Sequence, residues 1–220
     1  CTALIMHTFL KCWIAMEAPR RIGTDHRSGA LELLISTPLR VEEILRGQWM
    51  ALLRQFGAAA ALVCAVDFLF LSLGLKHTYS VSDRHMWIGI WLAGIAVFVI
   101  DLVAIPPVAV WLSLVGRKTS RAGTTSLVLI CCLPWLLFGG FIAVIAILDE
   151  VFRVGQAASN SGWFFLGVWF ALCVVIDLLL GAWALTSLRT RFRIVATQRP
   201  ESRPAIWGRW LGRKFARNGK

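Results

Sequence analysis

The sequence lacks the short motifs by which many enzymes and metalloproteins are recognised. It contains no G-x-x-x-x-G-K-[ST] phosphate-binding loop, no G-x-S-x-G nucleophile turn and no H-E-x-x-H zinc helix. No paired C-x-x-C spacing occurs among its six cysteines, and its four histidines are scattered, so a zinc site is not predicted. The chain therefore has no means of its own to cradle the phosphates of ATP. We expect neither covalent chemistry nor a resident metal or cofactor.

Charged residues are rare in four long apolar stretches. Each stretch exceeds the roughly 20 helical residues that cross the hydrocarbon core of a bilayer. With 58% hydrophobic residues and a mean hydropathy of +0.70, the composition is typical of a chain that is soluble only in lipid or detergent. The predicted membrane spans are 51–75, 86–115, 124–148 and 163–187.

A fifth apolar run, residues 1–16, is too short to span a bilayer. It begins at Cys1 without an initiator methionine and leads into charged residues, so we expect it to be the end of a membrane helix whose beginning is missing. A secretory signal peptide is the competing interpretation, but such a peptide has a basic start and a small-residue cleavage site. The sequence has neither feature.

Acidic residues are also few, with 12 Asp and Glu against 23 Lys and Arg. A net charge of +11 can indicate a nucleic-acid partner, but the distribution of the charge favours another explanation. Eighteen basic residues lie in 17–47, 116–123 and 188–220, against three in 76–85 and 149–162. This alternation follows the positive-inside rule if the first three segments are cytoplasmic. No nucleic-acid partner is predicted.

A polar segment, residues 28–47, interrupts the apolar sequence. Ser28 can cap a short helix, and Thr37-Pro38 ends it and begins a second, because the residue before proline avoids the α region and proline suits the first helical position. Two such amphipathic helices form either a platform for a soluble partner or an ordinary loop resting on lipid headgroups. The apolar face of the second helix, which can lie on the membrane surface, comprises Val41, Ile44, Leu45, Gln48 and Trp49.

The run GALELLISTPL at 29–39, followed by EILRG at 43–47, resembles the loop between the second and third membrane helices of ABC transporter permeases of the type 2 export class. The family pattern reads roughly G-[TA]-L-E-x-L-x-[ST]-[ST]-P, then an isoleucine-leucine pair and a glycine. A lysine commonly follows that glycine, where this chain has Gln48. The matching positions are Gly29, Leu31, Glu32, Thr37, Pro38, Ile44 and Gly47.

The resemblance implies that this loop contains the coupling helix, which contacts a separate ATP-binding subunit and carries its ATPase cycle into the membrane. It also implies a second permease half or a homodimer, a bacterial inner-membrane location and no ATPase activity on this chain. We therefore expect an all-α integral membrane protein of about five transmembrane helices, the first one partial. Its predicted parts are a truncated helix at 1–16, a cytoplasmic coupling loop at 17–50, four spans within 51–187 and a basic cytoplasmic tail at 188–220.

Three carboxylates, Asp67, Asp101 and Asp177, lie well inside three different predicted spans. A carboxylate at the bilayer centre costs a few kcal/mol, so these side chains should face protein or water. They are either proton or cation carriers, as in an ion-coupled secondary transporter, or posts that fix helix packing or line a cavity. We favour packing or cavity lining, because no Lys, Arg or His lies deep enough in these spans to complete a relay. An intramembrane enzyme is the third and lowest-ranked hypothesis, because the sequence shows no nucleophile motif and no cluster of metal ligands.

Proline and tryptophan mark two further features. Pro106-Pro107 and Pro134 fall inside predicted spans, where each proline removes a backbone donor and bends its helix. In the basic tail, aromatic and aliphatic residues at helical spacing predict an interfacial helix on anionic membrane lipid. These tail residues are Ile206, Trp207, Trp210, Leu211 and Phe215.

Overall fold

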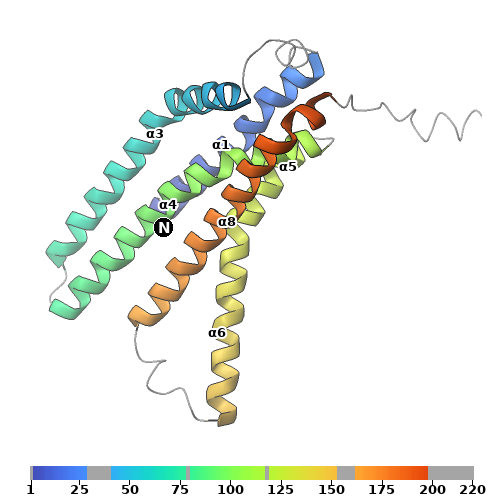
Figure 1. The fold of residues 1–220 in the computed structure, drawn as a ribbon. Helices are drawn as coiled ribbons and strands as arrows, with labels where there is room; N and C mark the ends of the chain where they lie inside the picture. Colours follow the sequence, from blue (N-terminus) through green and yellow to red (C-terminus); the bar gives the residue numbers. More distant parts are fainter. Residues whose placement is uncertain (1, 29–40, 78–79, 117–118, 153–161, 198–220) are drawn as a thin grey trace, which may run out of the picture.

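The computed structural model describes residues 2–28, 41–77, 80–116, 119–152 and 162–197 (Figure 1). Within these residues all regular secondary structure is helical, which confirms the predicted all-α class. The elements are α1 (Thr2–Ser28), α3 (Val41–His77), α4 (Val81–Val115), α5 (Thr119–Leu127), the π-helical turn η1 (Val128–Cys132), α6 (Leu133–Phe152) and α8 (Gly162–Thr197).

Four of the helical segments are long and apolar enough to cross a membrane, so the chain is a multi-pass membrane protein. Each contains one of the predicted spans, and the third is built from α5, η1 and α6 in succession. The helices extend past the predicted ends because their terminal turns continue into polar sequence. The segments are Val41–Lys76, Asp83–Val115, Arg121–Leu148 and Gly162–Phe192.

Helix α1 continues well beyond the apolar run 1–16 and ends at Ser28. The charges that follow that run are compatible with the helix, since Glu17 and Arg20 are an i, i+3 pair with 3.9 Å between Arg20 Nη1 and Glu17 Oε2. Ser28 is therefore the last residue of α1, whereas the sequence suggested it as the cap of a following helix. Five of the predicted coupling residues lie outside the described residues, namely Gly29, Leu31, Glu32, Thr37 and Pro38.

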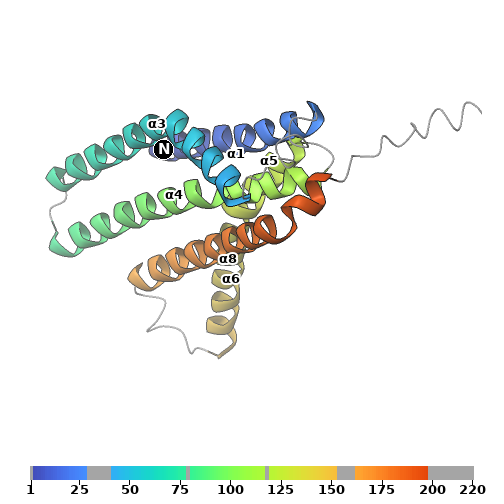
Figure 2. The same cartoon turned by 45° about the horizontal axis from the view of Figure 1, so that its top comes forward.

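Helix α4 is the centre of the bundle, because it packs against α1, α3, α5 and α8. Figures 1 and 2 show α1, α3, α4 and α8 running alongside one another, while α6 leaves them at an angle. The buried core is concentrated near the C-terminal ends of α4 and α8, and we call this region the closed end. Its fully buried side chains include Ile105, Val108, Ala109, Leu188 and Phe192.

Helix α6 diverges because the third span changes direction at η1. Pro134 has no N–H to donate to the carbonyl of Ile130, four residues earlier. The π-helical turn Val128–Cys132 directly precedes this proline. Such turns widen a helix locally and are a known cause of helix bending. The bend predicted at Pro134 is therefore present, whereas Pro106-Pro107 are accommodated inside the continuous helix α4.

Helices α1 and α5 pack backbone to backbone at one point. Pro19 cannot donate to the carbonyl of Ala15, and Gly123 of α5 lies directly against that carbonyl. A Cβ atom at Gly123 would lie 2.6 Å from the Ala15 oxygen, which is too close for any side chain. Glycine is therefore required at position 123 for the two backbones to meet.

We expect Gly123→Ala to lower the free energy of unfolding by about 1–3 kcal/mol, because α1 and α5 must separate to admit the methyl group. The measurement is reversible unfolding in mixed micelles. Gly139→Ala in α6 is the matched control, since a Cβ there meets nothing within 4 Å. Equal stability of the two variants would show that the close contact is dispensable.

A candidate polar site between the membrane helices

The three intramembrane carboxylates are all buried in the protein. Asp67 of α3 is 0% exposed, Asp101 of α4 is 3% exposed and Asp177 of α8 is 1% exposed. The helices therefore turn these side chains away from lipid, as the cost of a charge in hydrocarbon requires. Burial alone leaves open whether each carboxylate has a partner.

Helix α1 supplies partners for two of them. Lys11 Nζ forms an ion pair with Asp101 Oδ2, and His7 Nε2 lies 2.6 Å from Asp67 Oδ2. Because His7 and Lys11 are four residues apart, they project from the same face of α1. The polar site thus joins four helices, with its basic groups on one and its carboxylates on the other three.

The prediction that no Lys, Arg or His lies deep in the spans of the aspartates did not consider basic groups from another helix. It considered only the spans that carry the aspartates, whereas both basic groups come from α1, whose apolar run seemed too short to span. The signal was present in the sequence as two basic side chains at i, i+4 within an apolar stretch. A basic residue in such a stretch needs a buried acidic partner, and this rule would have pointed to Asp67 and Asp101.

Phe98 of α4 lies between the two pairs. Its ring stacks on His7 with 4.1 Å between ring centroids and an interplanar angle of 19°. The Nζ atom of Lys11 lies 5.8 Å from the centroid of the same ring, within the range of a cation–π interaction. Phe98 is fully buried. It therefore holds both basic groups against their carboxylates.

Among the described residues, Asp177 is the buried carboxylate that forms no ion pair with a basic side chain. It lies near Asp101 and interacts with it electrostatically, with Lys11 as the nearby positive charge. In the part of the chain that the structure describes, neither carboxyl oxygen of Asp177 has a hydrogen-bond partner. A buried ionised carboxylate without a partner is costly, so the site has room for one more positive charge, either a proton or a cation.

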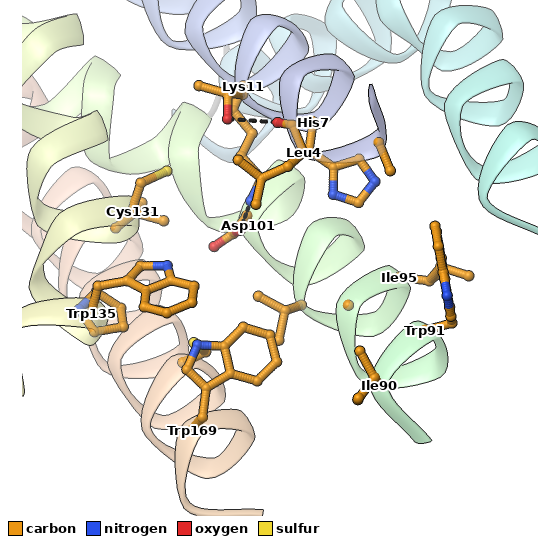
Figure 3. A pocket seen from close by; sticks show the side chains of 17 residues that line it. Leu4, His7, Lys11, Ile90, Trp91, Ile95, Asp101, Cys131, Trp135 and Trp169 are labelled. Atoms are coloured by element: carbon orange, nitrogen blue, oxygen red, sulfur yellow. Dashed lines mark hydrogen bonds and ion pairs between the residues drawn. The ribbon is translucent and has the colours of Figure 1, made fainter. Parts of the chain in front are cut away.

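A cavity of about 390 Å³ adjoins the Lys11–Asp101 pair. It lies in the half of the bundle away from the closed end. Figure 3 shows Lys11 and His7 on one side, the indoles of Trp135 and Trp169 on another and Trp91 across from them, with Asp101 between. Apart from Thr8, the rest of the lining is apolar and includes Leu4, Ile90, Ile95, Val97, Ile130, Cys131, Pro134 and Cys173.

The beginning of α3 forms a second candidate site at the closed end. The predicted apolar face is confirmed, since Val41, Ile44, Leu45, Gln48 and Trp49 are half-buried. The opposite side of the helix, which includes Gly47, is exposed. Figure 1 shows these first turns crossing the end of the bundle before α3 turns to run beside α4.

This apolar face packs on protein, whereas the sequence suggested a position on the membrane surface. Leu45 and Trp49 share a small cavity with Pro106, Pro107 and Leu188, so the beginning of α3 lies against the proline pair of α4 and against α8. Glu42 Oε1 also lies 3.9 Å from Arg189 Nε of α8. The physical reason is that the prolines free backbone carbonyls and leave a recess that large side chains fill.

No family model, curated protein or solved structure matches this chain. Among the residues with described positions, no group of three His, Cys, Asp or Glu side chains could hold a metal ion. The function must therefore be argued from the polar site, from the beginning of α3 and from the sequence motif.

Proposed function

We propose that the chain is the membrane subunit of an ATP-driven ABC transporter of the type 2 export class, and that it receives mechanical input at the beginning of α3. The observation that carries the proposal is the seating of this segment on the proline pair of α4 and on α8. Its exposed face, including Glu42, Arg46 and Gly47, remains available to a soluble partner. The sequence motif at 29–47 is the basis for proposing this family. The contacts of α3 with α4 and α8 are the proposed route by which movement of the coupling loop reaches the membrane helices.

In this proposal a separate subunit binds and hydrolyses ATP, and this chain does no covalent chemistry. Movement of the coupling loop displaces the first turns of α3, which press on α4 beside Pro106 and Pro107 and on α8. Because α4 and α8 both border the closed end, their separation would open the path on that side. ATP-bound and ATP-free partners act by stabilising different arrangements of these helices.

The assembly that follows from the family has two ATP-binding subunits and two permease halves, the second being another polypeptide or a second copy of this chain. In the proposed assembly the motif contacts the ATP-binding subunits, so residues 17–50 and 188–220 would be cytoplasmic and the spans would cross a bacterial inner membrane. The alternation of basic segments along the sequence supports this orientation.

The direct test is co-purification of the full chain from its native membrane, where we expect an ATP-binding subunit in stoichiometric amount. Glu32→Ala and Pro38→Ala are then expected to insert normally and to abolish transport while ATP hydrolysis persists. Asp83→Ala, in the exposed first turn of α4, is the matched control. Normal substrate-stimulated ATPase activity and normal transport in both coupling variants would contradict the proposal.

One observation favours a second candidate, an ion- or proton-coupled secondary transporter. Asp177 lacks a hydrogen-bond partner within the described residues, and it faces Asp101, Lys11 and the thiols of Cys131 and Cys173. Such a carboxylate can exchange a proton or a cation during transport. Asp177→Asn separates the candidates, because flux would lose its dependence on an ion gradient in a secondary transporter, whereas any flux that remains in an ABC permease would still require ATP and no ion gradient.

A further inference from the structure

The cavity beside the Lys11–Asp101 pair combines aromatic walls with an uncompensated acidic group. Its volume of about 390 Å³ falls within the range of small-molecule sites. Leu4, Ile90 and Trp135 line it and are also exposed on the outer surface of the bundle. A ligand can therefore enter from that surface.

The charges near the cavity favour a cation over an anion. Lys11 lines the cavity, and its ammonium group is already paired with Asp101. His7 also lines the cavity and is paired with Asp67. Asp177 lies near Asp101, one turn beyond the lining residue Cys173 on the same helix. Among the described residues, the carboxyl group of Asp177 is thus left without a basic partner, and a cation bound beside it would favour its ionised form.

The aromatic side chains point to the same class of ligand. Three tryptophans line the cavity, and an indole face is the best aromatic partner for an organic cation. The indoles of Trp135 and Trp169 are 5.8 Å apart between ring centroids and inclined at 50°, so they form two adjoining walls. Trp91 lies across from them (Figure 3).

Trp169 adds one requirement. Its indole nitrogen is buried and, as far as the described residues extend, has no hydrogen-bond partner. A buried N–H without an acceptor is costly, and a ligand with a suitably placed oxygen would remove that cost. The cavity therefore offers the Lys11–Asp101 pair with Asp177 close behind it, aromatic walls and, among the described residues, one unpaired indole N–H.

We propose that this cavity binds an organic monocation with an aromatic or apolar body and a hydrogen-bond acceptor. Its ammonium group lies at Asp101 near Asp177, and its body lies among Trp91, Trp135 and Trp169. The binding of this cation does not depend on the proposed transport function. The further claim that the cation is the transported substrate does depend on that function.

The first test measures protection of a cavity cysteine in the full chain reconstituted in lipid nanodiscs. Cys131 lines the cavity, whereas its neighbour Cys132 is exposed on the outside of the helix. A variant that keeps only Cys131, with the other five cysteines replaced by serine, is followed with an uncharged thiosulfonate reagent, and a variant that keeps only Cys132 is the matched control. The probe is benzoylcholine, which joins an aromatic ring, an ester oxygen and a quaternary ammonium group.

We expect benzoylcholine to slow the modification of Cys131 and to leave that of Cys132 unchanged. The uncharged isostere 3,3-dimethylbutyl benzoate and the anion hippurate should protect far less. Equal protection by the isostere or stronger protection by the anion would overturn the assignment of charge. Absence of protection by benzoylcholine at any soluble concentration would overturn the site.

The second test measures equilibrium binding of benzoylcholine to single variants. Asp177→Asn should weaken binding by at least about tenfold, because it removes the carboxyl group that can ionise beside the bound cation in a poorly screened site. Trp169→Leu should weaken it several-fold through loss of the aromatic face. Asp83→Asn, which removes an exposed charge far along α4, should have no effect. Unchanged binding in Asp177→Asn would overturn the role of the acidic group.

These measurements need no ATP-binding subunit, so their failure and the failure of the proposed transport function are separate results. A chain that binds benzoylcholine but never associates with an ATPase would keep the site and lose the ABC assignment. A chain that associates with an ATPase but gives no protection of Cys131 would keep the assignment and lose the site.

Discussion

Lys11→Met is expected to lower the free energy of unfolding by about 3–5 kcal/mol. The substitution keeps the length of the side chain and removes its charge. Asp101, which is 3% exposed, would then carry a buried charge without its partner. The loss therefore comes mainly from the stranded carboxylate and only secondarily from the contact itself. Reversible unfolding in mixed micelles measures it.

The double variant Lys11→Met with Asp101→Leu should recover most of this stability, because an apolar pair of similar volume carries no desolvation cost. The control on the same helix is Arg20→Met. Arg20 is exposed and pairs with Glu17 at 3.9 Å, so its replacement should cost less than about 1 kcal/mol. If Lys11→Met cost no more than Arg20→Met, the buried ion pair would have no structural role.

Phe98→Ala is the second large effect, with an expected loss of about 3 kcal/mol. The ring is fully buried and contacts both His7 and Lys11. In a membrane the transfer of apolar groups contributes little, so the loss comes from the cavity and from the missing van der Waals contacts. The same unfolding measurement applies, and Phe98→Leu should give an intermediate value.

Phe68→Ala on α3 provides the matched control, since this phenylalanine is 52% exposed. We expect its replacement to change stability by no more than about 0.5 kcal/mol. A similar loss at both positions would mean that the chain responds to aromatic content in general, and the packing of Phe98 between the two basic groups would then explain nothing.

The two candidate sites lie in different parts of one bundle. The beginning of α3 lies at the closed end, beside Pro106 and Pro107. The cavity borders the N-terminal half of the same helix α4, where its lining residues lie between Ile90 and Asp101. Helix α4 borders both the beginning of α3 and the cavity. A displacement of α4 at Pro106 and Pro107 would therefore also move its residues that line the cavity. This arrangement gives the proposed transport mechanism a physical link between input and ligand.

The helical class and the positions of the four spans follow from the amino-acid sequence alone, because length and apolar composition dictate both in a bilayer. It also determined the amphipathic face at the beginning of α3, since helical periodicity fixes which side chains share a side. It predicted that Asp67, Asp101 and Asp177 would avoid lipid, because charge in hydrocarbon is costly at any position.

The contacts that these residues make depend on how the helices pack. Helical periodicity predicts which face of a helix is buried but does not predict which helix covers that face. The pairing of His7 and Lys11 with Asp67 and Asp101 therefore depends on where α1 packs. The same holds for the beginning of α3, which could have rested on lipid and lies instead on the prolines of α4. Contacts between residues that are sixty or ninety positions apart in the chain arise from helix packing, and helix packing is a property of the whole bundle.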